Sequence, residues 1–106
     1  MTNNLQGTID LLILKTLERG SNHGFGITLH IQEVSGGLLK VEEGSLYPAL
    51  HRLERDKLVE AEWKISENGR RARYYKLTAQ GRKALAQHAE NWDTLQRGVR
   101  KVMRFA

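Results

Sequence analysis

Apolar residues recur at steps of three and four in three stretches of the first half of the chain, a spacing that predicts helices with one buried face. The expected helices cover about residues 8–19, 24–34 and 45–57, with a turn between the first two. Ser45 is expected to cap the third helix. That cap would put Pro48 in the first turn, where a missing N–H costs little. The buried face of this helix is predicted to consist of Leu46, Ala49, Leu50 and Leu53.

The spacing changes from a helical repeat to strict alternation at about Leu58. Residues 59–66 alternate apolar and polar side chains, which predicts a strand with one buried face. Asn-Gly at residues 68–69 is a strong hairpin signal, and residues 71–77 predict the return strand. Trp63 falls on the inner face of the first strand, so we expect its ring to belong to the core.

A long final helix is predicted from residue 79 to about residue 104, with Thr78 as its cap. Its apolar stripe repeats at steps of three and four, close to the spacing of a coiled coil. The other helices are too short to cover this stripe, so we expect it to pack against a second copy of the chain. The predicted dimer interface consists of Leu85, Ala89, Trp92, Leu95, Val99 and Val102.

Three helices followed by a two-stranded hairpin is the element order of a winged helix-turn-helix. The sequence therefore predicts a mainly α fold with a small β-hairpin. We expect a winged helix-turn-helix DNA-binding domain over residues 5–78 and a C-terminal dimerisation helix over residues 79–106. In this architecture the third helix enters the major groove of DNA, while the tip of the hairpin reaches phosphates or the minor groove.

The chain is basic, with a formal net charge of +5 and a pI near 9.8, which favours a polyanionic partner. The excess is not evenly spread. Residues 40–83 hold eleven Lys and Arg against seven Asp and Glu, whereas residues 1–39 hold two against three. The positive charge is therefore concentrated on the predicted third helix and hairpin, the two elements that a winged helix places on DNA.

The outer face of the third helix is expected to meet base edges and flanking phosphates. The cations of the hairpin are expected to act mostly on the DNA backbone, so salt should weaken binding steeply. The candidate DNA contacts are Ser45, Tyr47, Pro48, His51, Arg52, Lys64, Arg70, Arg71 and Arg73.

Two glycines near the start of the second helix, Gly24 and Gly26, indicate a close approach of some other group. That group is either a neighbouring helix or a phosphate, and the sequence favours helix packing. A dinucleotide-binding loop is excluded, because no strand precedes these glycines and the third glycine of that motif is missing.

Several function classes fit the sequence poorly. The chain has no cysteine and its four histidines lack metal-ligand spacing, so we expect no metal site and no cofactor. Gly-x-Ser-x-Gly is absent and no carboxylate pair suggests a catalytic pocket, so we do not expect an enzyme. We find no signal-peptide pattern and no apolar run long enough to span a bilayer, and we expect a cytoplasmic protein.

Several short motifs resemble those of the PadR family of bacterial transcription regulators, in order over about residues 5–85. They are the run from Gly44 to Leu53 with its Leu-Tyr-Pro, His23-Gly24-Phe25-Gly26-Ile27, Ala61-Glu62-Trp63, Arg73-Tyr74-Tyr75-Lys76-Leu77-Thr78 and Gly81-Arg82. The resemblance implies a dimeric DNA-binding repressor of the subgroup with a single C-terminal helix. Members often control efflux or detoxification genes, and some release DNA when they bind a small aromatic ligand.

The resemblance also makes Trp92 a candidate ligand-binding residue, because an aromatic side chain on the dimerisation helix can line a flat pocket at the two-fold axis. The alternative is that Trp92 only anchors the dimer interface, where large aromatic residues are common. Two other functions stay open for the whole chain. A winged helix can serve only for protein–protein contact, or it can bind RNA.

Overall fold

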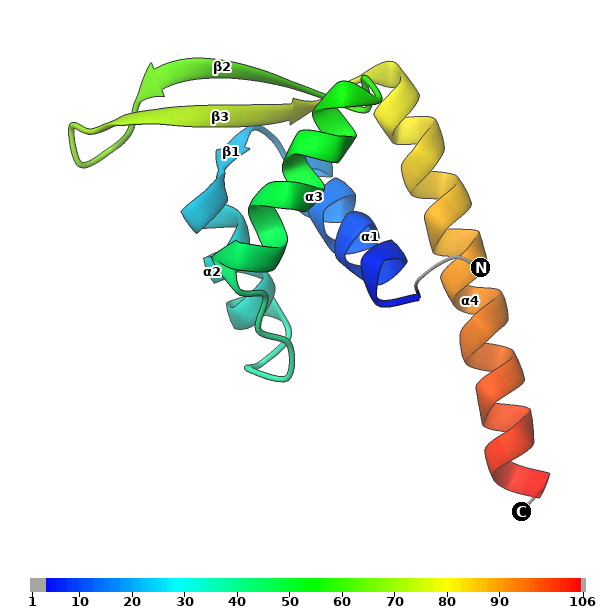
Figure 1. The fold of residues 1–106 in the computed structure, drawn as a ribbon. Coiled ribbons are helices and arrows are strands. Elements are labelled where there is room, and N and C mark those ends of the chain that lie inside the picture. The colour runs from blue at the N-terminus through cyan, green and yellow to red at the C-terminus, as the bar shows by residue number, and fades with distance from the viewer. Residues whose placement is uncertain (1–3, 106) are drawn as a thin grey trace.

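The computed structural model describes residues 4–105 and has the predicted helices and hairpin in the predicted order, with one additional short strand (Figure 1). Three helices pack together beneath a small antiparallel sheet, a hairpin projects to one side, and the last helix runs away on the other. The fold is therefore mainly α, as the sequence predicted. Its elements are α1 (Asn4–Glu18), β1 (Asn22–His23), α2 (Gly24–Val34), α3 (Glu43–Arg55), β2 (Val59–Ile65), β3 (Arg71–Leu77) and α4 (Ala79–Phe105).

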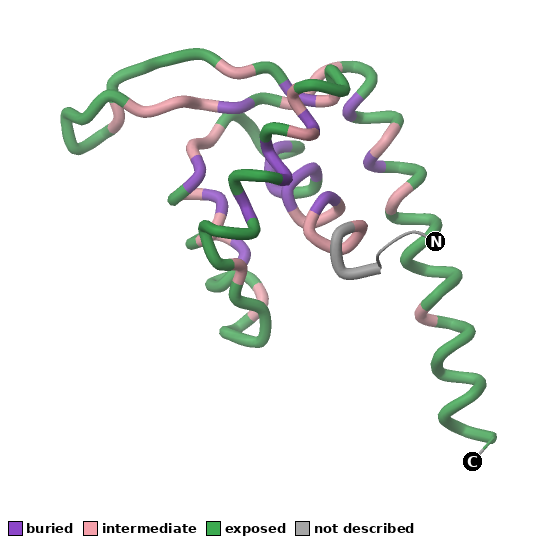
Figure 2. Tube along the Cα trace, in the orientation of Figure 1, coloured by how far each residue is buried: buried purple, intermediate pink, exposed green. Residues whose placement is uncertain are grey.

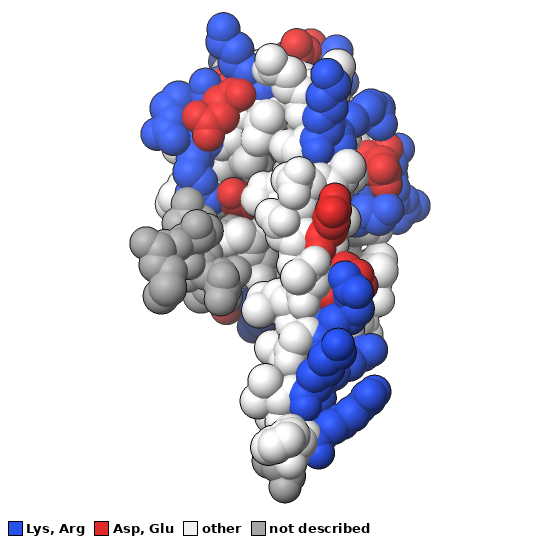
Figure 3. Space-filling view, turned by 90° about the vertical axis from the view of Figure 1, so that its right-hand side faces the viewer, with Lys and Arg blue, Asp and Glu red and all other residues white. Residues whose placement is uncertain are grey.

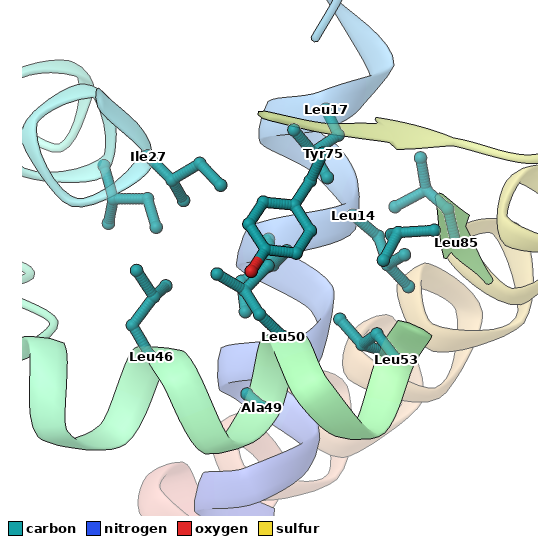
Figure 4. Close-up of a cluster of buried hydrophobic side chains, with 12 residues drawn as sticks. Leu14, Leu17, Ile27, Leu46, Ala49, Leu50, Leu53, Tyr75 and Leu85 are labelled. Carbon is teal, nitrogen blue, oxygen red and sulfur yellow. The ribbon is translucent and has the colours of Figure 1, made fainter. Parts of the chain in front are cut away.

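The core lies where α1, α2 and α3 meet the base of the hairpin, whereas the outer hairpin and most of α4 are exposed (Figure 2). Tyr75 is the largest fully buried side chain, and its ring lies between α1 and α3 (Figure 4). The predicted buried face of α3 is confirmed. The core cluster consists of Ile13, Leu14, Leu17, Ile27, Ile31, Leu46, Ala49, Leu50, Leu53, Val59, Tyr75 and Leu85.

Two predicted helix starts were wrong. Helix α1 begins at Asn4, before the expected cap at Thr8. Helix α3 begins at Glu43 with Glu42 as its N-cap, so Ser45 is a helical residue and makes no cap. Pro48 therefore lies beyond the first turn, where it cannot donate the usual hydrogen bond to a carbonyl four residues earlier.

The turn expected after α1 instead contains the two-residue strand β1, which completes a three-stranded sheet in the order β1-β3-β2. Asn22 pairs with Tyr75 and His23 with Tyr74, both antiparallel. His23 also caps α2, since its Nδ1 accepts a hydrogen bond of 3.0 Å from the Gly26 amide. The start of α2 is thus fixed to the sheet.

Trp63 does not belong to the core, contrary to the prediction, because 56% of its surface is exposed. The alternation along β2 did identify a single face, on which Val59 is buried and Ala61 partly buried. However, the outer part of the hairpin extends past the helices (Figure 2), and Trp63 on this part of the same face is exposed. We call this hairpin, residues 59–77, the wing.

The junction between the wing and α4 is tightly packed. Thr78 caps α4 as predicted, since its Oγ1 accepts a hydrogen bond of 2.9 Å from the Gly81 amide. A Cβ atom on Gly81 would lie 2.1 Å from the Leu58 carbonyl oxygen, so only glycine allows this approach. One turn later Leu85 lies in the core, and beyond it α4 leaves the domain. None of the helices within residues 4–105 is long and apolar enough to cross a bilayer.

Candidate nucleic-acid interface

The face of α3 that points away from the core carries the first group of candidate DNA contacts. Ser45, Pro48 and His51 are all exposed, as the helical period requires once Leu46 and Leu50 are buried. Hydroxyl and imidazole groups can donate to or accept from base edges and phosphates. The exposed face of α3 therefore offers polar contacts over more than one turn.

Tyr47 lies at the edge of that face and packs against α2. A Cβ atom on Gly24 would lie 2.5 Å from the Tyr47 hydroxyl oxygen, so the absence of a side chain at Gly24 makes room for the ring. Partial burial, with a smaller contribution from the charge of Glu43, raises the pKa of the Tyr47 phenol. The phenol stays neutral at physiological pH and keeps its proton for donation. The close approach predicted at Gly24 is thus confirmed as helix packing.

Arg52 turns toward α1 and forms an ion pair with Asp10. The exposed fractions of the two side chains are 23% and 12%, so water screens the pair only in part. Burial raises the pKa of the Asp10 carboxyl, and the positive charges of Arg52 and His88 offset part of that effect. This pair connects α3 to α1, 42 residues earlier in the chain.

Arg73 makes a similar connection from the base of the wing. Its Nη2 lies 2.7 Å from Glu54 Oε2 on α3, and its guanidinium carbon lies 6.0 Å from the centre of the Tyr75 ring. Both partners are partly buried. The wing is therefore attached to α3 by an ion pair as well as by the core.

The other cations of the wing lie farther out and are exposed. Lys64 points to the opposite face of the hairpin from Trp63, where its Nζ lies 3.3 Å from Glu62 Oε1. Arg70 lies at the turn. The guanidinium carbon of Arg71 lies 4.7 Å from the centre of the Trp63 ring, within the range of a cation–π contact.

A groove of about 1130 Å³ separates the wing from the helices. Its helical side is lined by Phe25 and Leu29 of α2 and by Tyr47 and His51 of α3, and Trp63 and Arg71 line the wing side. Tyr47 and His51 thus face the same space as the outer wing. The sequence reasoning missed Phe25 and Leu29, although their spacing of four marks a second apolar face on α2.

The outer part of α4 presents an uncharged face along the helix, with Lys and Arg side chains gathered at one edge (Figure 3). Among the predicted interface residues, Leu85 belongs to the core of its own chain, whereas the rest of the stripe is exposed. Met103 and Phe105 are exposed as well and extend the apolar surface to the end of the helix. The exposed predicted residues are Ala89, Trp92, Leu95, Val99 and Val102.

Comparison with known proteins agrees with this architecture. The model of the PadR-like family of transcriptional regulators matches residues 13–87. This chain belongs to that family. It is 36% identical to the transcriptional regulator Rv3488 of Mycobacterium tuberculosis over 94 residues, which cover 89% of this chain and 84% of that protein. The resemblance noted in the sequence is thus confirmed.

Solved structures of such regulators have the same fold. A transcriptional regulator from Clostridium thermocellum superposes with a TM-score of 0.83 at 27% identity, covering 95% of this chain and 96% of that one. A PadR-like transcriptional regulator from Bacillus cereus superposes with a TM-score of 0.77 at 25% identity, covering 96% and 97%.

PadR regulators bind DNA and are generally dimeric. Transcriptional regulators are generally not enzymes. Across residues 4–105, no three His, Asp or Glu side chains are arranged to hold a metal ion.

Proposed function

We propose that this chain is a homodimeric, sequence-specific DNA-binding repressor that recognises an inverted repeat. Helix α3 enters the major groove and the wing lies on the adjacent backbone and minor groove. The observation that carries the proposal is that His51 of α3 and Arg70 and Arg71 of the outer wing border one groove. A duplex seated there would meet polar groups from α3 and positive charge from the wing.

The candidate DNA contacts divide by position. Ser45, Pro48 and His51 are free to meet base edges, with Tyr47 beside them. Arg70, Arg71 and Lys64 are exposed and would contact phosphates or the minor groove. Arg52 and Arg73 are engaged with carboxylates of their own chain, so we propose that they act mainly by holding α3 and the wing in place.

The exposed apolar stripe of α4 supports the proposed dimer. Single exposed apolar residues are ordinary, but a continuous stripe over several turns indicates an interface. Two copies joined through α4 would present two α3 helices related by a two-fold axis. The half-sites should then lie about 34–36 Å apart, one turn of DNA. A dimer bound across a promoter would block polymerase, which is why we propose repression.

The test is a DNA-binding titration in a salt series, with an operator selected by the protein from random-sequence duplexes. We expect binding to the operator well above binding to random duplex. His51→Ala should reduce this preference, and Arg71→Ala should weaken binding to both duplexes and lower the salt slope by about one. Lys76→Ala is the matched control, since Lys76 is exposed at the base of the wing, next to the buried Tyr75, and does not line the groove.

Equal affinity for operator and random duplex would contradict sequence-specific recognition. Tighter binding to structured RNA in a direct competition would instead indicate an RNA-binding module. A protein that binds neither nucleic acid and is recovered with a protein partner would indicate a module for protein–protein contact.

We also propose Trp92 as the residue that contacts a small aromatic effector. Trp92 is 43% exposed on the apolar stripe of α4, so two copies would bring two indole rings near the dimer axis. Planar aromatic compounds should quench the fluorescence of Trp92, measured in a Trp63→Phe background, and should weaken operator binding. Unchanged fluorescence and unchanged operator affinity would leave Trp92 as an interface anchor only.

A further inference from the structure

On the outer wing, Arg71 stacks on the ring of Trp63, a residue that is not among the candidate DNA contacts. In the antiparallel register, Trp63 lies opposite Arg73 and Ile65 opposite Arg71, so Trp63 and Arg71 are diagonal neighbours on one face. Their separation of 4.7 Å places the guanidinium over the indole ring. The exposed indole ring of Trp63 thus covers one face of the Arg71 guanidinium.

The base of the wing holds this stack in a fixed place relative to α3. Tyr75, on the same face of β3, is fully buried in the core. Between Tyr75 and Arg71, the Arg73 side chain is attached to Glu54 of α3 by the ion pair of 2.7 Å. The stack therefore extends from a rigid base and borders the same groove as His51.

The charge of Arg71 is not neutralised by the chain itself. Within residues 4–105 Arg71 forms no ion pair, whereas Lys64, Arg52 and Arg73 each lie beside a carboxylate. The indole ring restricts the guanidinium to one plane and leaves its N–H edges free to donate. A planar cation with exposed edges suits a narrow, electronegative space.

We infer that Trp63 positions Arg71 for the minor groove beside the sequence read by α3, and that the pair makes the wing favour a narrow, A·T-rich groove. Narrow minor grooves have an enhanced negative potential that attracts arginine. The planar guanidinium can enter edge-on, while the ring prevents it from swinging to a phosphate. This inference rests on the proposed function, and it adds a source of specificity outside the half-site.

The experiment varies only the base pairs beneath the wing. Three duplexes share the selected operator and differ in flanking A·T, G·C or inosine·C pairs. Inosine·C lacks the guanine amino group, so it resembles A·T in the minor groove and G·C in the major groove. We expect the wild-type protein to bind the A·T and inosine·C flanks about 3- to 30-fold more tightly than the G·C flank.

The variants separate positioning from charge. Trp63→Ala should abolish the flank preference and keep the salt slope, because Arg71 retains its charge. Arg71→Lys should do the same, since an ammonium does not stack as a planar group. Trp63→Phe should restore part of the preference. Lys64→Ala, on the other face of the wing, should lower the salt slope and leave the preference intact.

Thermal unfolding should show that Trp63→Ala stays folded, because this ring is outside the core. Retention of the flank preference by folded Trp63→Ala would overturn the inference while the proposed function stands. Inosine·C behaving as G·C would overturn it as well. A wild-type protein that does not distinguish operator from random duplex would overturn both.

Discussion

The Asp10–Arg52 ion pair makes a sharp prediction about how α3 is held. Replacing Arg52 with alanine removes the cation and leaves the Asp10 carboxylate in a site where only 12% of its side chain is exposed. We therefore expect Arg52→Ala to destabilise the fold. It should weaken DNA binding by loosening α3 against α1 rather than by deleting a base contact.

The size of the effect follows from the burial of the two groups. Removing one partner of a fully buried pair costs about 3–5 kcal/mol, and a hydrogen bond to a charged group contributes about 1.5–3 kcal/mol. With Arg52 still 23% exposed, we expect a loss of about 2–3 kcal/mol, or about 8–15 °C in Tm for a domain of this size. Asp10→Ala should cost less, because the freed guanidinium can turn to solvent.

The assay is a double-mutant cycle on Arg52→Ala and Asp10→Ala, with unfolding followed in urea at one protein concentration, since a dimer's stability depends on concentration. The double variant should resemble the less damaged single variant, so the coupling should equal the loss caused by Arg52→Ala, about 2–3 kcal/mol. The deficit of Arg52→Ala should shrink in acid. Without Arg52 the pKa of Asp10 rises further, so the carboxyl takes up a proton and no longer needs a partner.

DNA binding at a temperature where every variant is folded completes the test. If Arg52 holds α3, then Arg52→Ala and Asp10→Ala should both lower operator affinity. The reasoning is refuted if Arg52→Ala keeps full stability and loses operator preference while Asp10→Ala keeps both. That result would make Arg52 a base-reading residue.

Three further predictions concern the packing, the dimer and the titration of Asp10. Gly81→Ala should destabilise by about 1–3 kcal/mol, because its Cβ would meet the Leu58 carbonyl oxygen at 2.1 Å, while Gly44→Ala in open space should stabilise by up to about 1 kcal/mol; thermal unfolding measures both. Leu95→Asp should shift the protein toward monomer in sedimentation. The pKa of Asp10 is raised in the folded state, so its contribution to stability is present below the ordinary value of 3.8 and lost as pH rises through the folded pKa. The stability of the wild type relative to Asp10→Asn should therefore fall over that acidic range in urea titrations.

The sequence correctly predicted helices and strands in which the spacing of apolar residues reflects packing against the core of the same chain. The buried face of α3 and the alternation of β2 are such cases, because each repeat reports which side chains share a face. The alternation along a strand does not show how much of its inner face the helices cover. Trp63 lies on the predicted face of β2, but a groove separates it from the helices, so its expected burial was wrong.

Strand pairing and ion pairs between residues far apart in the chain could not be predicted from the sequence, for a different reason. Strand β1 has two residues, too few for any period, and exists only because β3 provides its hydrogen-bonding partner. The partners of Arg52 and Arg73 lie 42 and 19 residues away, and the charge pattern of a helix does not identify such partners. The division of the basic residues into exposed and internally paired cations therefore needed the structure.

The junction at the start of α4 leads to a last prediction, about operator spacing. Thr78, Gly81 and Leu85 attach this helix to the wing and the core over its first two turns, so α4 should move as one body with the core and the wing. Adding one base pair between the half-sites rotates the second half-site by about 35° about the DNA axis, which a rigid dimer cannot follow. We expect that duplex to bind with the affinity of a single half-site, in a titration beside the original operator. Full affinity for the lengthened operator would show that the junction bends, and that the spacing of the two α3 helices is not set by α4.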